Sequence, residues 1–165
     1  MPTNRSGRRF RHYGIGCLLC LVLASDGCRS KSPHEGKSVA ELELMLQSDD
    51  AATQAAAAFG LSRHGAEAQP AVPALIKALG AKEALLRANA ALALGRIGPG
   101  ARDAVPALIG RLSDPEWTVC RQAALALGRI GKAAEAAIPA LQELADDSVP
   151  LMRKAAEEAL ANIRK

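Results

Sequence analysis

The chain has 165 residues, enough for one ordinary domain and a targeting segment. Hydrophobic residues make up 49% of it but aromatic residues only 2%, which argues against a β-sandwich and against a module that stacks nucleic-acid bases on aromatic side chains. The net charge of +4 comes mainly from positions 1–27, and the remainder holds 17 basic and 16 acidic side chains, so we expect no nucleic-acid binding. From position 38 onward the commonest residue is alanine, the best helix former, and this composition predicts an all-α fold.

Positions 1–27 have the pattern of an export signal. Four arginines precede the apolar run 14–24, which is too short to span a bilayer as a helix. The run is followed by a small residue and Cys28, and this order resembles a bacterial lipoprotein signal, in which the cysteine is freed by cleavage and acylated. The resemblance implies a signal peptide over 1–27, a lipid anchor on Cys28 and a location at the bacterial cell envelope. Cleavage after Ala24, giving an exported soluble periplasmic protein, is an alternative; a retained anchor and a chance resemblance to a signal are the others.

The polar stretch 28–37 contains proline and glycine and is expected to form a flexible tether. After it, a repeat with a period of 33 is the strongest pattern in the sequence. Ala-Val-Pro-Ala-Leu-Ile begins at Ala71 and Ala104, and Ala-Ala-Leu-Ala-Leu-Gly-Arg-Ile-Gly begins at Ala90 and Ala123. Since one such unit cannot bury its apolar face alone, we expect the units to stack and share a core. The predicted repeat domain covers 38–165, with repeats 38–70, 71–103, 104–136 and 137–165.

Each repeat has the pattern of two helices, here called helix A and helix B. Helix A is expected to start at a proline in three repeats, Pro73, Pro106 and Pro139, and at a capping box of Ser38 and Glu41 in the first. Helix B is expected to end at a glycine with a left-handed cap, at Gly65, Gly98 and Gly131. Gly95 and Gly128 lie inside helix B, where glycine costs about 1 kcal/mol relative to alanine. We therefore predict that neighbouring helices approach closely there.

These units resemble HEAT repeats of the phycobilisome-lyase-like variety, whose second helix reads like the Ala-Leu-Gly-Arg-Ile-Gly found here twice. The resemblance covers 38–165 and implies an α-solenoid of four two-helix repeats, with A helices on the convex side, B helices on the concave side, and a main role in holding other proteins. It also implies that an arginine early in helix B pairs with an aspartate of the turn. Arg87 and Arg153 occupy this position, whereas Cys120 interrupts the series and is expected to be a small buried filler.

Some relatives on this scaffold are enzymes, so a lyase-like or metal-dependent enzyme subunit is the alternative function. The resemblance to deoxyhypusine hydroxylase-like proteins would require repeated His-Glu pairs as iron ligands, and the chain has one such pair, His34-Glu35, in the predicted tether. The sequence contains no serine-nucleophile elbow and no glycine-rich phosphate loop. We therefore expect no enzyme activity, no cofactor and no metal.

Candidate binding residues follow from the helical wheel of helix B. With Leu94 as the core direction, the opposite side of the helix gives columns of residues that recur with the period of the repeat. One column is Phe59, Leu92, Leu125 and Glu158, the next is Arg63, Arg96, Arg129 and Asn162, and a third is Ala52, Leu85, Thr118 and Leu151. Two interpretations remain open: incidental exposure on an alanine-rich helix, or an apolar groove edged by arginines that binds an acidic amphipathic segment of a partner protein. Trp117 is expected either to cover the turn or to be a contact at the groove edge.

Overall fold

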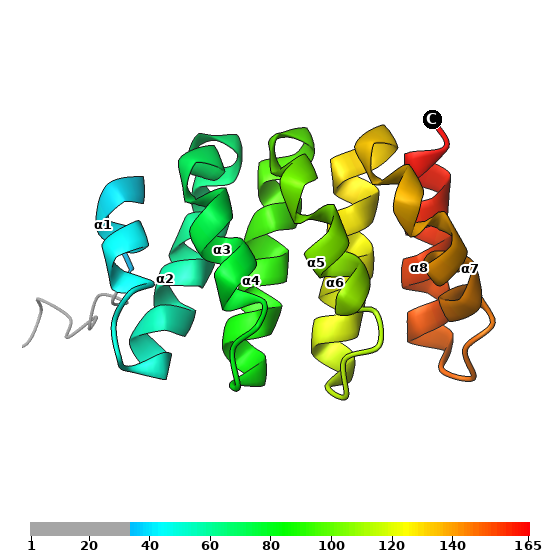
Figure 1. The fold of residues 1–165 in the computed structure, drawn as a ribbon, viewed down its shortest axis with the longest axis horizontal. Helices are drawn as coiled ribbons and strands as arrows, with labels where there is room; N and C mark the ends of the chain where they lie inside the picture. The colour runs from blue at the N-terminus through cyan, green and yellow to red at the C-terminus, as the bar shows by residue number, and fades with distance from the viewer. Residues whose placement is uncertain (1–33) are drawn as a thin grey trace, which may run out of the picture. The chain divides into compact units, whose positions relative to one another are not determined.

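The computed structural model describes residues 34–165, and within that range every regular element is a helix. The all-α prediction is therefore confirmed. Four helical hairpins stand side by side in chain order (Figure 1). The A helices are α1 (Val39–Met45), α3 (Val72–Ala78), α5 (Val105–Gly110) and α7 (Ile138–Ala145). The B helices are α2 (Ala51–His64), α4 (Ala84–Ile97), α6 (Trp117–Ile130) and α8 (Pro150–Ile163), and their starts follow the period of the repeat.

The B helices form the main layer of the stack. Helix α4 packs between α2 and α6, and α6 packs between α4 and α8, while each A helix contacts mainly the B helix of its own hairpin. In Figure 1, helices α3, α5 and α7 are seen in front of the B helices, and α1 is seen beside α2 at one end of the stack. The arrangement is the α-solenoid expected from the repeat.

One hydrophobic core runs through the four hairpins. It is built from leucines at equivalent positions, because a side chain that cannot be buried within one hairpin is covered by the next. The A helices contribute Leu42, Leu75, Leu108 and Leu141, and the B helices contribute Leu61, Leu94, Leu127 and Leu160. All eight are buried. The shared core explains how such short hairpins make one stable domain.

Neighbouring B helices approach closely at glycines, as predicted. A Cβ atom on Gly95 would lie 2.9 Å from the Cα of Ala126, and one on Gly128 would lie 2.7 Å from the Cα of Ala159. Both distances are too short for a carbon–carbon contact, and both end on the backbone of the next B helix. Glycine is therefore needed at these two positions for packing rather than for backbone freedom.

The connection from helix B to the next helix A differs from the expected single cap. Gly65, Gly98 and Gly131 have φ between 57° and 74°, but their ψ values of −130° to −140° lie outside the left-handed helical region. The chain then continues as a short 3₁₀ helix. These segments are η1 (Gly65–Ala71), η2 (Gly98–Ala104) and η3 (Gly131–Ala137). The prediction of a left-handed cap is correct in the sign of φ and wrong in ψ.

The starts of the A helices agree with the sequence analysis. Each of the three prolines lies in the first turn of its helix, one residue after the helix begins. At α1 the capping box is present: the Ser38 backbone N–H donates to Glu41 Oε2 at 2.8 Å, and the Glu41 N–H donates to Ser38 Oγ at 3.4 Å. These features fix where each A helix begins and so set the register of the stack.

Candidate functional site: the B-helix face

The B helices expose one side, which we call the B-helix face. It consists of four columns of equivalent residues, one residue from each of α2, α4, α6 and α8. In chain order the columns are Ala52, Leu85, Thr118 and Leu151; Ala55, Ala88, Arg121 and Lys154; Phe59, Leu92, Leu125 and Glu158; and Arg63, Arg96, Arg129 and Asn162. Ala55 is buried, and the other fifteen residues are at least partly exposed. The opposite side of α4, with Leu86, Ala90, Leu94 and Ile97, is buried.

The structure places all the sequence-predicted binding residues on or beside this face. Arg63, Arg96 and Arg129 are exposed, one on each of three neighbouring helices. Phe59 is 37% exposed, and Leu92 and Leu125 are half-buried. Trp117 is 54% exposed at the start of α6, one helical turn before Arg121, and therefore borders the same face. Two further exposed leucines, Leu85 and Leu151, lie in the third column of the helical wheel, which was not among the predicted binding residues.

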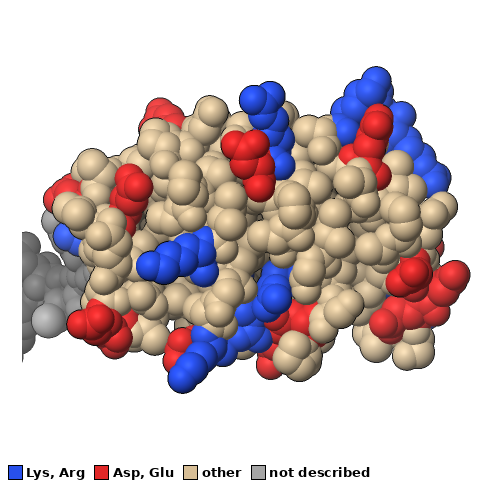
Figure 2. Space-filling view, viewed as in Figure 1, with Lys and Arg blue, Asp and Glu red and all other residues tan. Residues whose placement is uncertain are grey.

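Positive charge is concentrated on the B-helix face. Residues 34–165 hold 15 basic and 16 acidic side chains, yet the four columns contain five cations and one carboxylate. The cations are Arg63, Arg96, Arg121, Arg129 and Lys154, and none of them has a carboxylate oxygen within 4 Å among the described residues. The side of the stack seen in Figure 2, on which α3, α5 and α7 lie, instead shows basic and acidic side chains interspersed over a largely uncharged surface. The net charge of the chain does not reveal this unequal distribution of charged side chains.

A small hollow lies on this face between α6 and α8. Its volume is about 180 Å³, and its walls are Leu125, Leu151 and Ala155 with Arg121, Lys154 and Glu158 around them. Ligand pockets for small molecules are usually larger, of the order of 300–1,000 Å³. The hollow is therefore of a size to hold one large side chain of a binding partner.

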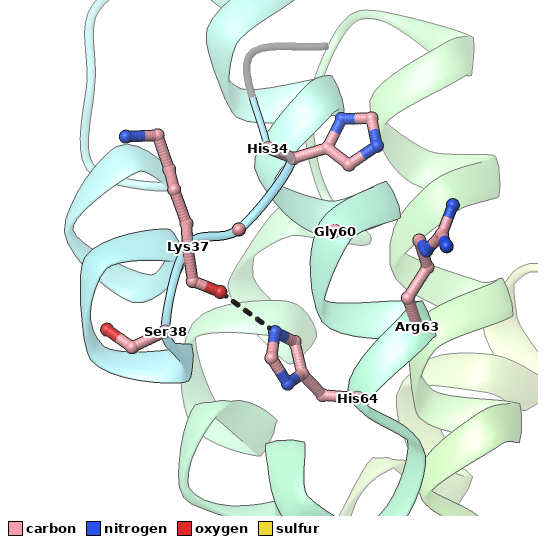
Figure 3. A pocket seen from close by; sticks show the side chains of 7 residues that line it. His34, Lys37, Ser38, Gly60, Arg63 and His64 are labelled. Carbon is pink, nitrogen blue, oxygen red and sulfur yellow. Dashed lines mark hydrogen bonds between the residues drawn. The ribbon is translucent and has the colours of Figure 1, made fainter. Parts of the chain in front are cut away.

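Part of the predicted tether is folded against the first hairpin. Residues 34–36 form a turn, and the ring of His34 meets Phe59 edge-on with 5.1 Å between ring centroids. His64 Nε2 lies 3.0 Å from the carbonyl oxygen of Lys37 (Figure 3). The aromatic contact and the hydrogen bond thus join residues 34–37, the end of the predicted tether over 28–37, to the first hairpin. Residues 1–27 and Cys28 lie outside the described residues.

Gly60 allows this turn to pack on α2. A Cβ atom there would lie 2.8 Å from the Cβ of His34, which Figure 3 shows above Gly60. The equivalent residues Ala126 and Ala159 meet the preceding B helix instead, at Gly95 and Gly128. His34 therefore takes the place that a preceding B helix takes elsewhere in the stack. A pocket of about 520 Å³ remains beside it, with Arg63 at its edge.

One position early in each B helix ties the helix to its own turn. Gln54, Arg87, Cys120 and Arg153 are equivalent, and each donates a hydrogen bond to a carbonyl oxygen of the preceding turn. Arg87 alone of these four also forms a bidentate ion pair with the turn of the next hairpin, at 2.8 and 2.7 Å from the two oxygens of Asp114. The arginine–aspartate pairing implied by the family resemblance is present, but it joins two repeats.

Cys120 is a buried member of this series. Its Sγ lies 2.9 Å from the carbonyl oxygen of Leu112, and its side chain is 6% exposed. Burial, followed by the negative charges of Asp147 and Asp114, raises the pKa of the Cys120 thiol. A thiol with a raised pKa is a poor nucleophile at neutral pH, which agrees with a structural role.

Within residues 34–165 no group of three or more histidine, cysteine, aspartate or glutamate side chains is placed to hold a metal ion. His34 and Glu35, the one His-Glu pair, lie in the turn before α1. None of the described helices is long and apolar enough to cross a membrane.

The stack of hairpins with a common core and one shared face defines an α-solenoid. A sequence model of HEAT repeats matches residues 39–102 and 99–161, and the chain belongs to the HEAT-repeat family. No curated protein matches the chain.

Solved structures share the fold. Human deoxyhypusine hydroxylase in complex with glycerol is 30% identical over 79% of this chain and 44% of its own, with a TM-score of 0.59. The complex of CpcE and CpcF of phycocyanin lyase from Nostoc sp. PCC7120 is 26% identical over 77% of this chain and 65% of the other, with a TM-score of 0.58. An engineered protein is 28% identical over 76% and 62%, with a TM-score of 0.64. The chain covers less than two thirds of the length of each.

Proposed function

We propose that the protein is a non-enzymatic scaffold that binds a partner protein through the B-helix face at the bacterial cell envelope. The observation that carries this proposal is the column of Arg63, Arg96 and Arg129, which have no carboxylate partner within residues 34–165, beside the partly exposed apolar column Phe59, Leu92 and Leu125. A partner that buries both columns must supply carboxylates next to apolar side chains. Such a pattern is that of an acidic amphipathic segment.

The interleaving of apolar and cationic side chains favours protein over nucleic acid as the partner. A phosphate backbone gains from cations but gains nothing from burying Leu92, Leu125 and the exposed Leu85. Burial of such side chains is a main source of binding free energy in protein interfaces, at roughly 25 cal/mol per Å² of apolar surface. The B-helix face is suited to a partner that contributes both kinds of contact.

Capture of partners from envelope extract tests the scaffold. Full-length protein with a C-terminal tag is compared with Leu92→Glu/Leu125→Glu, which places two negative charges in the apolar column, and with the control Lys77→Glu/Lys132→Glu, which changes exposed residues outside the four columns. We expect the B-helix-face variant to lose proteins that the wild type and the control both retain. Recovery of the same proteins by all three baits, each with wild-type helicity by circular dichroism, would contradict the proposal.

The attachment to the envelope is proposed from the lipoprotein-like order of residues before Cys28. Bacterial cells grown with radioactive palmitate should label the wild-type protein but not Cys28→Ser. A Cys120→Ser variant serves as control, since it removes a cysteine from the repeat domain and should keep full labelling. Equal labelling of wild type and Cys28→Ser would remove the anchor from the account and leave the binding face unaffected.

A further inference from the structure

We propose that the hollow between α6 and α8 is the anchor site of the B-helix face, and that it takes one bulky apolar side chain of a segment whose acidic residues lie on the α4 side of that anchor. This inference rests on the proposed function and specifies the partner for it. Three features support it: the chemistry of the walls, the cations around them and the position of one carboxylate.

Apolar side chains of the B-helix face enclose a volume at this hollow. Leu125 is half-buried, Leu151 is 39% exposed, and Ala155 of α8 is buried. At about 180 Å³ the hollow matches a leucine, methionine or phenylalanine side chain rather than a cofactor. A partner side chain in the hollow would bury apolar surface that is otherwise exposed to solvent. An anchor residue contributes to binding in this way.

Cations surround the hollow and continue away from it in one direction. Arg121 and Lys154 border it directly, and Arg129 follows two turns later on α6. Arg96 and Arg63 continue the arginine column across α4 and α2. Carboxylates of a bound segment could therefore pair with cations all the way from the hollow to the first hairpin.

Glu158 determines on which side of the hollow the acidic residues of a bound segment can lie. It borders the hollow on α8, where the column that holds Phe59, Leu92 and Leu125 changes from apolar to acidic. A carboxylate placed beyond the anchor on this side would meet a like charge. An acidic segment is thus favoured when its charges lie over α4 and α6 and disfavoured when they lie beside Glu158.

The single tryptophan of the chain provides the measurement. Trp117 is 54% exposed and lies one helical turn before Arg121, so binding at the hollow should change its fluorescence. The probes are three synthetic nonapeptides: a central phenylalanine with four acidic residues on each side, the same peptide with a central alanine, and the same with lysines in place of the acidic residues. They are titrated into the full-length protein at low salt.

We expect the phenylalanine peptide to bind saturably, the alanine peptide to bind several-fold more weakly and the lysine peptide not to bind. Arg121→Glu/Lys154→Glu should weaken binding by about tenfold or more, since two attractive contacts become repulsive. The control Lys77→Glu/Lys132→Glu makes the same change in net charge and should bind like wild type. Glu158→Gln should bind the phenylalanine peptide about two- to fivefold more tightly, a gain that misfolding could not produce.

The inference is overturned if the phenylalanine and alanine peptides bind alike, if a single-stranded oligonucleotide of equal charge binds as tightly, or if Glu158→Gln brings no gain. If no peptide binds but partner capture still depends on Leu92 and Leu125, the anchor site is overturned and the proposed function stands. If no peptide binds and partner capture does not depend on Leu92 and Leu125, both the anchor site and the proposed function are overturned.

Discussion

Replacing Arg87 with methionine should destabilise the domain strongly, by about 3–5 kcal/mol. The Arg87 side chain donates four hydrogen bonds, two to Asp114 and two to the carbonyl oxygens of Ala81 and Lys82. The carboxylate of Asp114 is fully buried, and without Arg87 it keeps only the 3.3 Å contact with Arg111 and the N–H of Glu116. A buried charge without an adequate partner carries most of the expected cost.

Urea unfolding of Arg87→Met and Arg153→Met measures this effect with a matched control. Arg153 occupies the same position in α8 and donates to the carbonyl oxygens of Asp147 and Ser148, but it has no carboxylate partner among the described residues. Its replacement should cost only about 1 kcal/mol. Similar losses for the two variants would show that the ion pair between repeats contributes nothing to stability.

The same pair makes stability depend on pH. Burial by itself raises the pKa of the Asp114 carboxyl, but the hydrogen bonds from Arg87 and Glu116 and the charges of Arg87 and Arg111 outweigh it, so the pKa lies below its usual value. A carboxyl whose pKa is lower in the folded state stabilises the fold above its unfolded pKa of about 3.9, and this contribution is lost as the pH falls through the folded pKa. The Arg87→Met variant should therefore lose less stability than wild type on acidification below about pH 4.

Adding one methyl group at Gly128 should destabilise the stack by about 1–3 kcal/mol, even though alanine is the better helix former by about 1 kcal/mol. The new Cβ would lie 2.7 Å from the Cα of Ala159, and only a shift of α8 away from α6 relieves this. Gly95→Ala should act in the same way at the contact of α4 with α6, where the distance is 2.9 Å.

Gly110 supplies the control for this prediction. It ends α5, is exposed and has no atom within 4 Å of an added Cβ. Gly110→Ala should leave the free energy of unfolding unchanged or raise it by about 0.5–1 kcal/mol. If Gly128→Ala proves as stable as Gly110→Ala in thermal unfolding, the close packing of B helices is not the reason for the glycine.

Repetition made most of the fold predictable from the sequence. A residue that recurs at the same place in several units must satisfy the same contact each time, so the prolines of helix A and the glycines inside helix B could be interpreted without coordinates. The 3₁₀ segments were missed, although Ala68 and Ala71 and their equivalents carry a signal. Buried alanines at this spacing fit the three residues per turn of a 3₁₀ helix.

The candidate site was predictable only where it follows the repeat. The arginine column and Trp117 were found because a helical wheel places them. The cations Arg121 and Lys154 were not predicted as binding residues. Their equivalents in the first two repeats are alanines, so no residue type recurs throughout this column. Contacts that occur once, such as His34 with Phe59, depend on how the chain enters the stack, and no periodic pattern encodes them.

Site-specific photocross-linking tests the central claim, that the B-helix face is the binding surface, most directly. A photoreactive phenylalanine analogue is introduced at Leu85, which is 65% exposed on α4, or at Lys77, which is exposed on the A helix of the same hairpin. After irradiation of intact cells, we expect a discrete cross-linked protein from position 85 and none from position 77. Cross-links from position 77 alone, or the same product from both positions, would contradict the assignment of binding to the B-helix face.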